Sequence, residues 1–86
     1  MSKTQPPLLS VKARAPFQVF YEGPAKVVSA TNKVGKFDIL PGHADFFSVL
    51  NAGEVVIETE AEPVNFSINN GILTVRGNEV MLFANM

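Results

Sequence analysis

The side chains with the greatest potential for chemistry lie around His43, the only histidine in the chain. Asp38, Asp45 and Ser48 are close to it in sequence. A serine, an imidazole and a carboxylate can form a hydrolytic triad, and an imidazole with two carboxylates supplies part of a zinc site. Residues this close on one turn and strand rarely meet in a relay, and a Pro-Gly turn separates Asp38 from His43. We therefore predict no catalytic and no metal-binding residues, and we interpret His43 as a turn residue that bonds to backbone or faces a partner.

Four glutamates are the other candidates for acid–base chemistry. Glu54, Glu58 and Glu60 are predicted to share one face of a strand, and Glu62 lies at the following turn. Paired carboxylates catalyse reactions when burial or mutual repulsion separates their pKa values. These side chains are predicted to be solvated, because a charged outer face discourages edge-to-edge aggregation. The pattern therefore indicates a solvent-facing strand.

The composition excludes several classes of function. A net charge of −1, with seven Lys and Arg residues, is too little positive charge for nucleic-acid binding. The absence of cysteine excludes disulfides, thiolate nucleophiles and Cys-based metal sites. No glycine-rich phosphate-binding motif is present, and no cofactor is predicted. The aromatic residues fall mostly at inward strand positions and are predicted to belong to the core.

The chain is short and carries little charge. Its 86 residues are 47% hydrophobic and only 17% charged. A chain of this length forms one domain, predicted over residues 8–86 after a disordered lead-in over residues 1–7. Part of the surface must be apolar or neutral, and such a surface often docks against a partner. No apolar run reaches the roughly 18–20 residues that cross a bilayer, so no direct membrane insertion is predicted.

Apolar and polar residues alternate with a period of two, which is typical of strands. Val64, Phe66 and Ile68, for example, alternate with Asn65 and Ser67. Turn residues separate such runs at short intervals. The fold class is therefore predicted to be all-β, a two-layer antiparallel β-sandwich of about nine to ten short strands with no C-terminal helical hairpin. The predicted strands cover residues 8–15, 17–21, 25–30, 35–40, 46–50, 54–60, 64–69, 71–76 and 79–84.

Two turns and the last strand have distinctive composition. Asn70-Gly71 is predicted to form a tight hairpin turn, and Gly77-Asn78 is predicted to do the same in the last hairpin. Residues Val80–Ala84 are apolar on both faces of the last strand. Met81 and Phe83 are therefore either partly exposed, covered internally or covered by a partner.

The segment Gly35–Ala44 has the pattern G-x-h-x-h-L-P-G-H-A, where h is hydrophobic, and it contains the only histidine. This pattern matches the signature of one family. Together with the other segments, it resembles the N-terminal β-sandwich domain of the epsilon subunit of F-type ATP synthases, which is called delta in mitochondria. The match is collinear from about Leu9 to Asn85. It includes Val19–Gly23, Asn51–Val55, Asn69–Val75 and Glu79–Asn85.

The resemblance implies a non-catalytic rotor subunit, not an enzyme, that links the gamma subunit to the c-ring and couples proton transport to ATP synthesis. It also implies a peripheral location at the cytoplasmic face of an energy-transducing membrane. The positions that match the gamma-facing segment are His43, Ala44, Phe46, Phe47 and Ser48. The positions that match the c-ring-facing loop are Thr31, Asn32, Lys33, Val34, Gly35 and Lys36.

The sequence departs from the family pattern at Lys36, where an acidic residue is common, and at Asp45, where a proline is usual. Family members continue into two C-terminal helices that regulate ATP hydrolysis and in some members bind ATP. This sequence stops at Met86, so we expect no inhibitory role and no nucleotide binding. An alternative hypothesis is a free-standing epsilon-like adaptor that binds another protein outside a synthase. A small enzyme or sugar-binding sandwich is a third hypothesis, which lacks a candidate site.

Overall fold

The computed structural model describes residues 8–85, and the predicted lead-in over residues 1–7 lies outside this range. No helix in the described part of the chain has the length and apolar character to cross a bilayer. The number of strands falls within the predicted range. The nine strands within residues 8–85 are β1 (Leu9–Ala15), β2 (Gln18–Ala25), β3 (Val27–Asn32), β4 (Gly35–Ile39), β5 (Phe46–Leu50), β6 (Gly53–Glu58), β7 (Val64–Ile68), β8 (Asn70–Arg76) and β9 (Glu79–Asn85).

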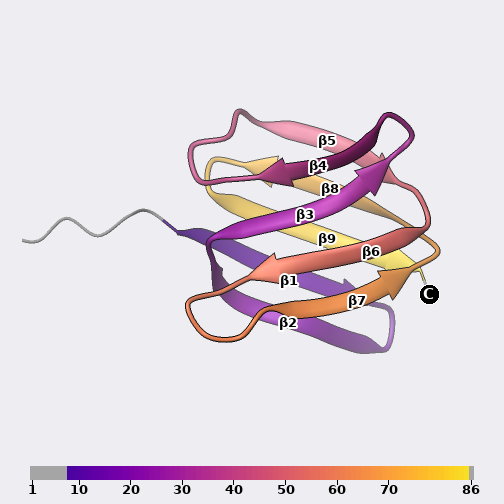
Figure 1. The fold of residues 1–86 in the computed structure, drawn as a ribbon, viewed down its shortest axis with the longest axis horizontal. Coiled ribbons are helices and arrows are strands. Elements are labelled where there is room, and N and C mark those ends of the chain that lie inside the picture. The colour runs from indigo at the N-terminus through magenta and orange to yellow at the C-terminus, as the bar shows by residue number, and fades with distance from the viewer. Residues whose placement is uncertain (1–7, 86) are drawn as a thin grey trace, which may run out of the picture.

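The strands form a two-layer sandwich, which confirms the predicted fold class (Figure 1). The larger sheet has the order β2-β1-β9-β8-β5, and the smaller sheet has the order β4-β3-β6-β7. The strand pairs are antiparallel except for β1 and β9, which run parallel. This parallel pair joins the first and last strands in the interior of the larger sheet.

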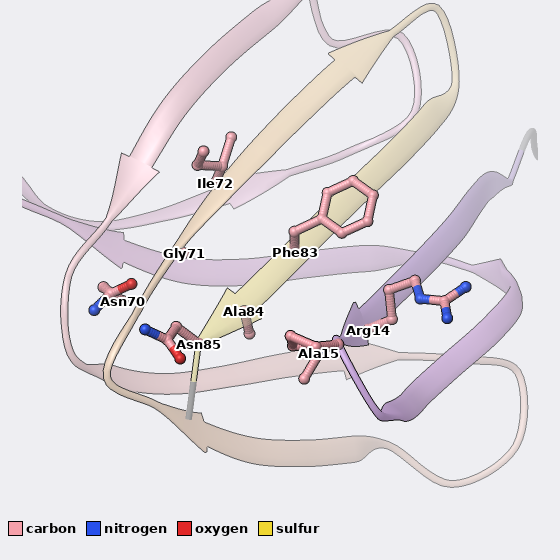
Figure 2. A pocket seen from close by; sticks show the side chains of 9 residues that line it. Arg14, Ala15, Asn70, Gly71, Ile72, Phe83, Ala84 and Asn85 are labelled. Atoms are coloured by element: carbon pink, nitrogen blue, oxygen red, sulfur yellow. The ribbon is translucent and has the colours of Figure 1, made fainter.

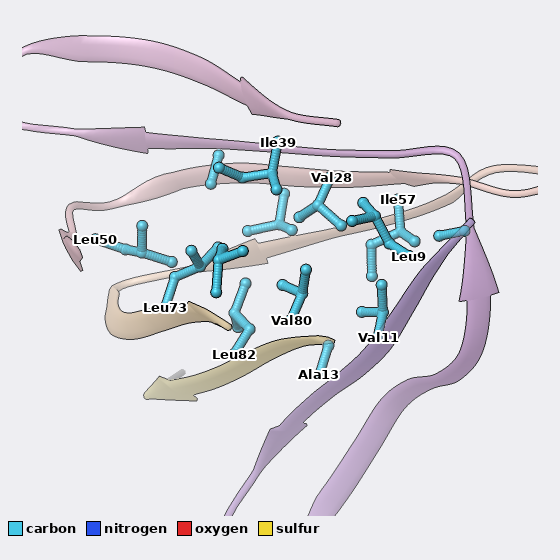
Figure 3. Packing of buried hydrophobic residues seen from close by; sticks show 14 of the residues in the cluster. Leu9, Val11, Ala13, Val28, Ile39, Leu50, Ile57, Leu73, Val80 and Leu82 are labelled. Atoms are coloured by element: carbon cyan, nitrogen blue, oxygen red, sulfur yellow. The ribbon is translucent and has the colours of Figure 1, made fainter. Parts of the chain in front are cut away.

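The core lies between the two sheets because each strand turns alternate apolar side chains inward (Figure 3). In β1, Leu9, Val11 and Ala13 are buried, whereas the residues between them are exposed. Burial of a Val, Leu or Ile side chain stabilises a fold by about 1.5–3 kcal/mol. The largest buried side chains include Leu9, Ile39, Leu50, Ile57, Leu73 and Leu82.

Aromatic rings close the sandwich where the edge strands of the two sheets approach each other. Phe20 of β2 stacks on Phe66 of β7, with ring centroids 4.1 Å apart. At the opposite edge, Phe37 of β4 packs against Phe46 of β5 at a centroid distance of 5.5 Å. Aromatic side chains thus fill both edges of the sandwich.

The prediction of a tight hairpin turn at Asn70-Gly71 is wrong. The chain crosses here from β7 in the smaller sheet to β8 in the larger one. Gly71 lies within β8, opposite Ala84. A Cβ atom on Gly71 would lie 2.6 Å from the carbonyl oxygen of Phe83, so the glycine is required by the close approach of two backbones. The turn at Gly77-Asn78 does join β8 to β9 as predicted, with Gly77 at φ 60°.

Candidate interaction surfaces

Part of the outer face of the larger sheet is apolar, whereas β1 presents Lys12 and Arg14 on the same face. Five large hydrophobic side chains point away from the core on three neighbouring strands: Phe47 and Val49 on β5, Ile72 on β8, and Met81 and Phe83 on β9. Their exposed fractions run from 39% for Met81 to 63% for Phe47. A contiguous set of this kind on a soluble domain usually marks a binding site. We call these five residues the apolar face.

Cross-strand pairing makes the apolar face continuous. Val49 lies opposite Ile72, and Ile72 lies opposite Phe83, so one row of apolar side chains crosses three strands. The adjacent row runs from Phe47 through a threonine of β8 to Met81. Side chains directly opposite each other have Cβ atoms about 4.5–5.5 Å apart. The two rows therefore form a single patch.

The outer face of the smaller sheet is polar. The Ser29 hydroxyl donates a hydrogen bond to Oδ1 of Asp38 across β3 and β4, at 2.7 Å. Glu54 and Glu58 are exposed on β6. Glu60, which was predicted to share their strand face, lies beyond the end of β6. Burial of the outer face of the larger sheet would therefore remove more apolar surface from water than burial of the outer face of the smaller sheet.

The residues predicted to face gamma occupy different environments. Phe47 lies on the apolar face, and Ala44 is exposed in the loop before β5. Phe46 is half-buried against His43, with ring centroids 5.4 Å apart. Ser48 points toward the core and is only 9% exposed. The Ser48 side chain therefore lies on the core side of β5 and does not reach the outer face of the larger sheet.

His43 belongs to a turn that its own backbone and side chain stabilise. Its N–H group donates to the carbonyl oxygen of Leu40 at 3.0 Å. Its Nδ1 atom lies 2.7 Å from the carbonyl oxygen of Ala44, a contact that requires the proton on Nδ1. Within residues 8–85, no three His, Cys, Asp or Glu side chains come together as a metal site. The imidazole therefore serves the conformation of its loop.

The loop that carries His43 is fastened to the β8–β9 turn. The N–H of Gly42 donates to Oδ1 of Asn78 at 3.0 Å, and the N–H of Gly77 donates to Oδ1 of Asp45 at 2.9 Å. Asp45, at the position where the family usually has proline, thus holds the loop through its side chain. Sequence reasoning missed both contacts because they join residues 36 and 32 positions apart.

The turn between β3 and β4 carries the residues predicted to face the c-ring. Oδ1 of Asn32 accepts hydrogen bonds from the N–H groups of Val34 at 2.8 Å and Gly35 at 3.2 Å. Nδ2 of Asn32 donates to the buried hydroxyl of Ser48 at 3.2 Å. Lys33 and Val34 are exposed at the tip, Val34 at 88%. Asn32 therefore ties the turn to β5 in the other sheet, a link that the sequence pattern did not indicate.

Comparison with known proteins identifies the family of this sandwich. The family model described as "ATP synthase, Delta/Epsilon chain, beta-sandwich domain" matches residues 8–86. The chain belongs to this family. The resemblance inferred from Gly35–Ala44 and the collinear segments is thereby confirmed.

Curated relatives of this epsilon-type chain are ATP synthase epsilon chains. The protein from Synechococcus elongatus is 31% identical over 77 residues, which cover 90% of this chain and 56% of that protein. The protein from Stenotrophomonas maltophilia is 37% identical over 68 residues, which cover 78% and 49%. The protein from Trichlorobacter lovleyi is 36% identical over 55 residues, which cover 64% and 40%. The chain thus spans about half the length of the curated relatives it matches.

Solved structures share the epsilon-type fold. A chain in the Euglena gracilis mitochondrial ATP synthase (OSCP/F1/c-ring) matches with a TM-score of 0.85 at 16% identity, over 99% of this chain and 56% of that one. A chain in the central stalk/c-ring structure of the Tetrahymena thermophila mitochondrial ATP synthase matches with a TM-score of 0.81 at 18% identity, over 96% and 67%. At such low identity these likenesses show the fold alone.

Proposed function

We propose that this epsilon-type chain is a non-catalytic rotor subunit of an F-type ATP synthase. It binds the gamma subunit through the apolar face and the polar loops of the c-ring through the β3–β4 turn, and it thereby couples proton transport to ATP synthesis. It lies at the cytoplasmic face of the energy-transducing membrane, held there by the complex. Family membership supports this role, as does the fold shared with a chain from a central stalk/c-ring structure.

The apolar face is the observation that carries the gamma contact. An aromatic side chain can bury about 150–250 Å², and each Å² of apolar surface removed from water contributes about 25 cal/mol. The strands below this face are rigid, because their inward side chains, such as Leu73 and Leu82, are fully packed in the core. A preordered surface loses little conformational freedom on binding. Interface area, with no reactive group, is sufficient for the task.

The β3–β4 turn suits a second contact at one end of the sandwich (Figure 1). Its tip residues, Lys33 and Val34, are exposed, and Thr31 lies opposite Lys36 where the two strands enter the turn. Asn32 fixes the conformation of the turn through its side chain. The turn belongs to the smaller sheet and the apolar face to the larger one, so the molecule can hold both partners at once.

The test measures binding to an F1 complex that contains gamma and from which this chain has been removed. Phe47→Ser removes the most exposed ring of the apolar face and should weaken binding at least tenfold, which is about 1.4 kcal/mol. Asn65→Ser is the matched control, because Asn65 is exposed on the outer face of the smaller sheet. It should leave the affinity unchanged. If folded Phe47→Ser binds as tightly as the natural chain, the gamma contact is not on this face.

A further inference from the structure

A groove of about 310 Å³ opens at one end of the apolar face (Figure 2). Ile72 and Phe83 project from the neighbouring strands β8 and β9, and Arg14 lies at the other side on β1. Asn70 and Asn85 bring side-chain amides to the end of the groove. Most of the groove's lining is apolar. Among the described residues that line it, Arg14 is the only charged one.

The groove exists because β1 ends before β9 does. The parallel ladder between these strands finishes at the pair Arg14 and Phe83, whereas β9 continues to Asn85. β1 turns away at Pro16 to form its hairpin with β2, so the last residues of β9 are not covered by β1. Phe17, which follows Pro16 in this hairpin, is fully exposed, although it does not line the groove.

Arg14 is placed to pair with an acidic group from outside the chain. Its cross-strand neighbours are Val19 on β2 and Phe83 on β9, neither of which is acidic. Lys12, the preceding cation on the same face, lies opposite Glu22. A guanidinium can bind a carboxylate through two parallel hydrogen bonds, which adds geometric specificity to the attraction.

We propose that this groove is the anchor pocket of the gamma contact. It takes an apolar side chain of gamma that lies beside an Asp or Glu side chain, and Arg14 pairs with that carboxylate. The inference rests on the proposed function and adds the place and the chemistry of its strongest contact. Interfaces concentrate their binding energy where an apolar anchor fills such a pocket.

Two observations favour gamma as the occupant. The groove shares Ile72 and Phe83 with the apolar face, so one partner that covers the face also reaches the groove. The volume is at the lower limit for small-molecule pockets, about 300–1,000 Å³. This size suits one or two side chains better than a cofactor.

Two neighbouring rows of side chains permit a matched test. Arg14 and Phe83 face each other across β1 and β9 and line the groove, whereas Lys12 and Met81 form the preceding row on the same strands and lie outside it. Arg14→Gln and Lys12→Gln remove the same charge, so they reduce long-range attraction equally. Affinity is measured for the gamma-containing F1 complex. Arg14→Gln should weaken binding about tenfold more than Lys12→Gln, and this difference should shrink at high salt.

The second pair tests the apolar anchor. Phe83→Ser should lower the affinity at least about thirtyfold, as expected for an interface hot spot. Met81→Ser, which removes an exposed side chain of the apolar face outside the groove, should lower it less than about tenfold. Both side chains point outward, so both variants should fold, and thermal melts check that they do.

The outcomes separate the groove from the proposed function. If the two variants of each pair lose equal affinity for the F1 complex, the groove is not the anchor pocket, although the gamma contact on the apolar face still stands. Unchanged affinity in these four variants and in Phe47→Ser overturns the gamma contact itself. Light scattering tests whether the free chain dimerises. If it does, and if Phe83→Ser abolishes the dimer, a second copy of the chain occupies the groove, and the proposal that gamma occupies it is overturned.

Discussion

Asn32 provides the sharpest test of how the two proposed contact surfaces are joined. Its side chain makes three hydrogen bonds: it accepts from the N–H groups of Val34 and Gly35, and it donates to the hydroxyl of Ser48. The first two shape the β3–β4 turn, and the third crosses from the smaller sheet to β5 in the larger one. Asn32→Ala removes all three.

The expected loss of stability follows from the surroundings of each bond. One intramolecular hydrogen bond contributes about 0.5–1.5 kcal/mol net. Water can reach the turn and replace Asn32 as the acceptor for Val34, so this bond lies at the low end of the range, and the part-buried bond from Gly35 lies somewhat above it. Ser48 is only 9% exposed, so water replaces its lost partner poorly. The sum is about 2 kcal/mol, which lowers the Tm of a domain of this size by about 8–16 °C.

A double-mutant cycle with Ser48→Ala isolates the bond between the sheets. Urea unfolding gives the stability of the natural chain, of each single variant and of the double variant. The double variant should lose about 1 kcal/mol less than the sum of the single losses, because both substitutions remove the same bond. Hydrogen exchange at Val34 and Gly35 should accelerate far more in Asn32→Ala than in Ser48→Ala. A coupling energy near zero would refute the inter-sheet bond.

Two further predictions follow from single positions. Gly71→Ala should lower the free energy of unfolding by about 1–3 kcal/mol, because its Cβ would lie 2.6 Å from the carbonyl oxygen of Phe83; Gly77→Asn, at φ 60° in open space, should cost less than about 1 kcal/mol. Equal losses in thermal melts would contradict the backbone contact at Gly71. Lys36→Glu should change the affinity for the c-ring more than the affinity for gamma, since Lys36 is exposed beside the β3–β4 turn on the sheet opposite the apolar face. Equal losses in binding to the two partners would argue against two separate contacts.

The strands could be predicted from the sequence because their positions depend on local pattern. A side chain that alternates between core and solvent repeats every two residues, and this period is visible in short windows. Each of the nine strands in the described residues overlaps a predicted range, although β2 continues to Ala25, beyond the range 17–21 predicted for it. In β1, the alternation of Leu9, Val11 and Ala13 with polar residues matches the observed burial without exception.

Strand pairing and the contacts between loops could not be predicted, because they join residues far apart in the chain. Asn70-Gly71 has the composition of a hairpin turn, yet the chain passes between sheets there and the glycine is required by the backbone of β9. The hydrogen bond from Gly77 to Asp45 likewise depends on two turns that meet only in the folded sandwich. Local composition contains no information about contacts between turns that are far apart in the sequence.

The apolar face is visible in the sequence as a departure from alternation. Met81 and Phe83 are apolar although they are exposed, so the middle of β9 has no polar side. In β5 the pattern is reversed: Phe47 faces outward, whereas Ser48 faces the core, where Asn32 satisfies its hydroxyl. Folding alone gives no reason to expose Phe47 and Phe83, and the proposed binding of a partner accounts for departures that gather on one face of one sheet. Runs of consecutive apolar residues therefore indicate the surface, and the register that sets β5, β8 and β9 side by side determines its extent.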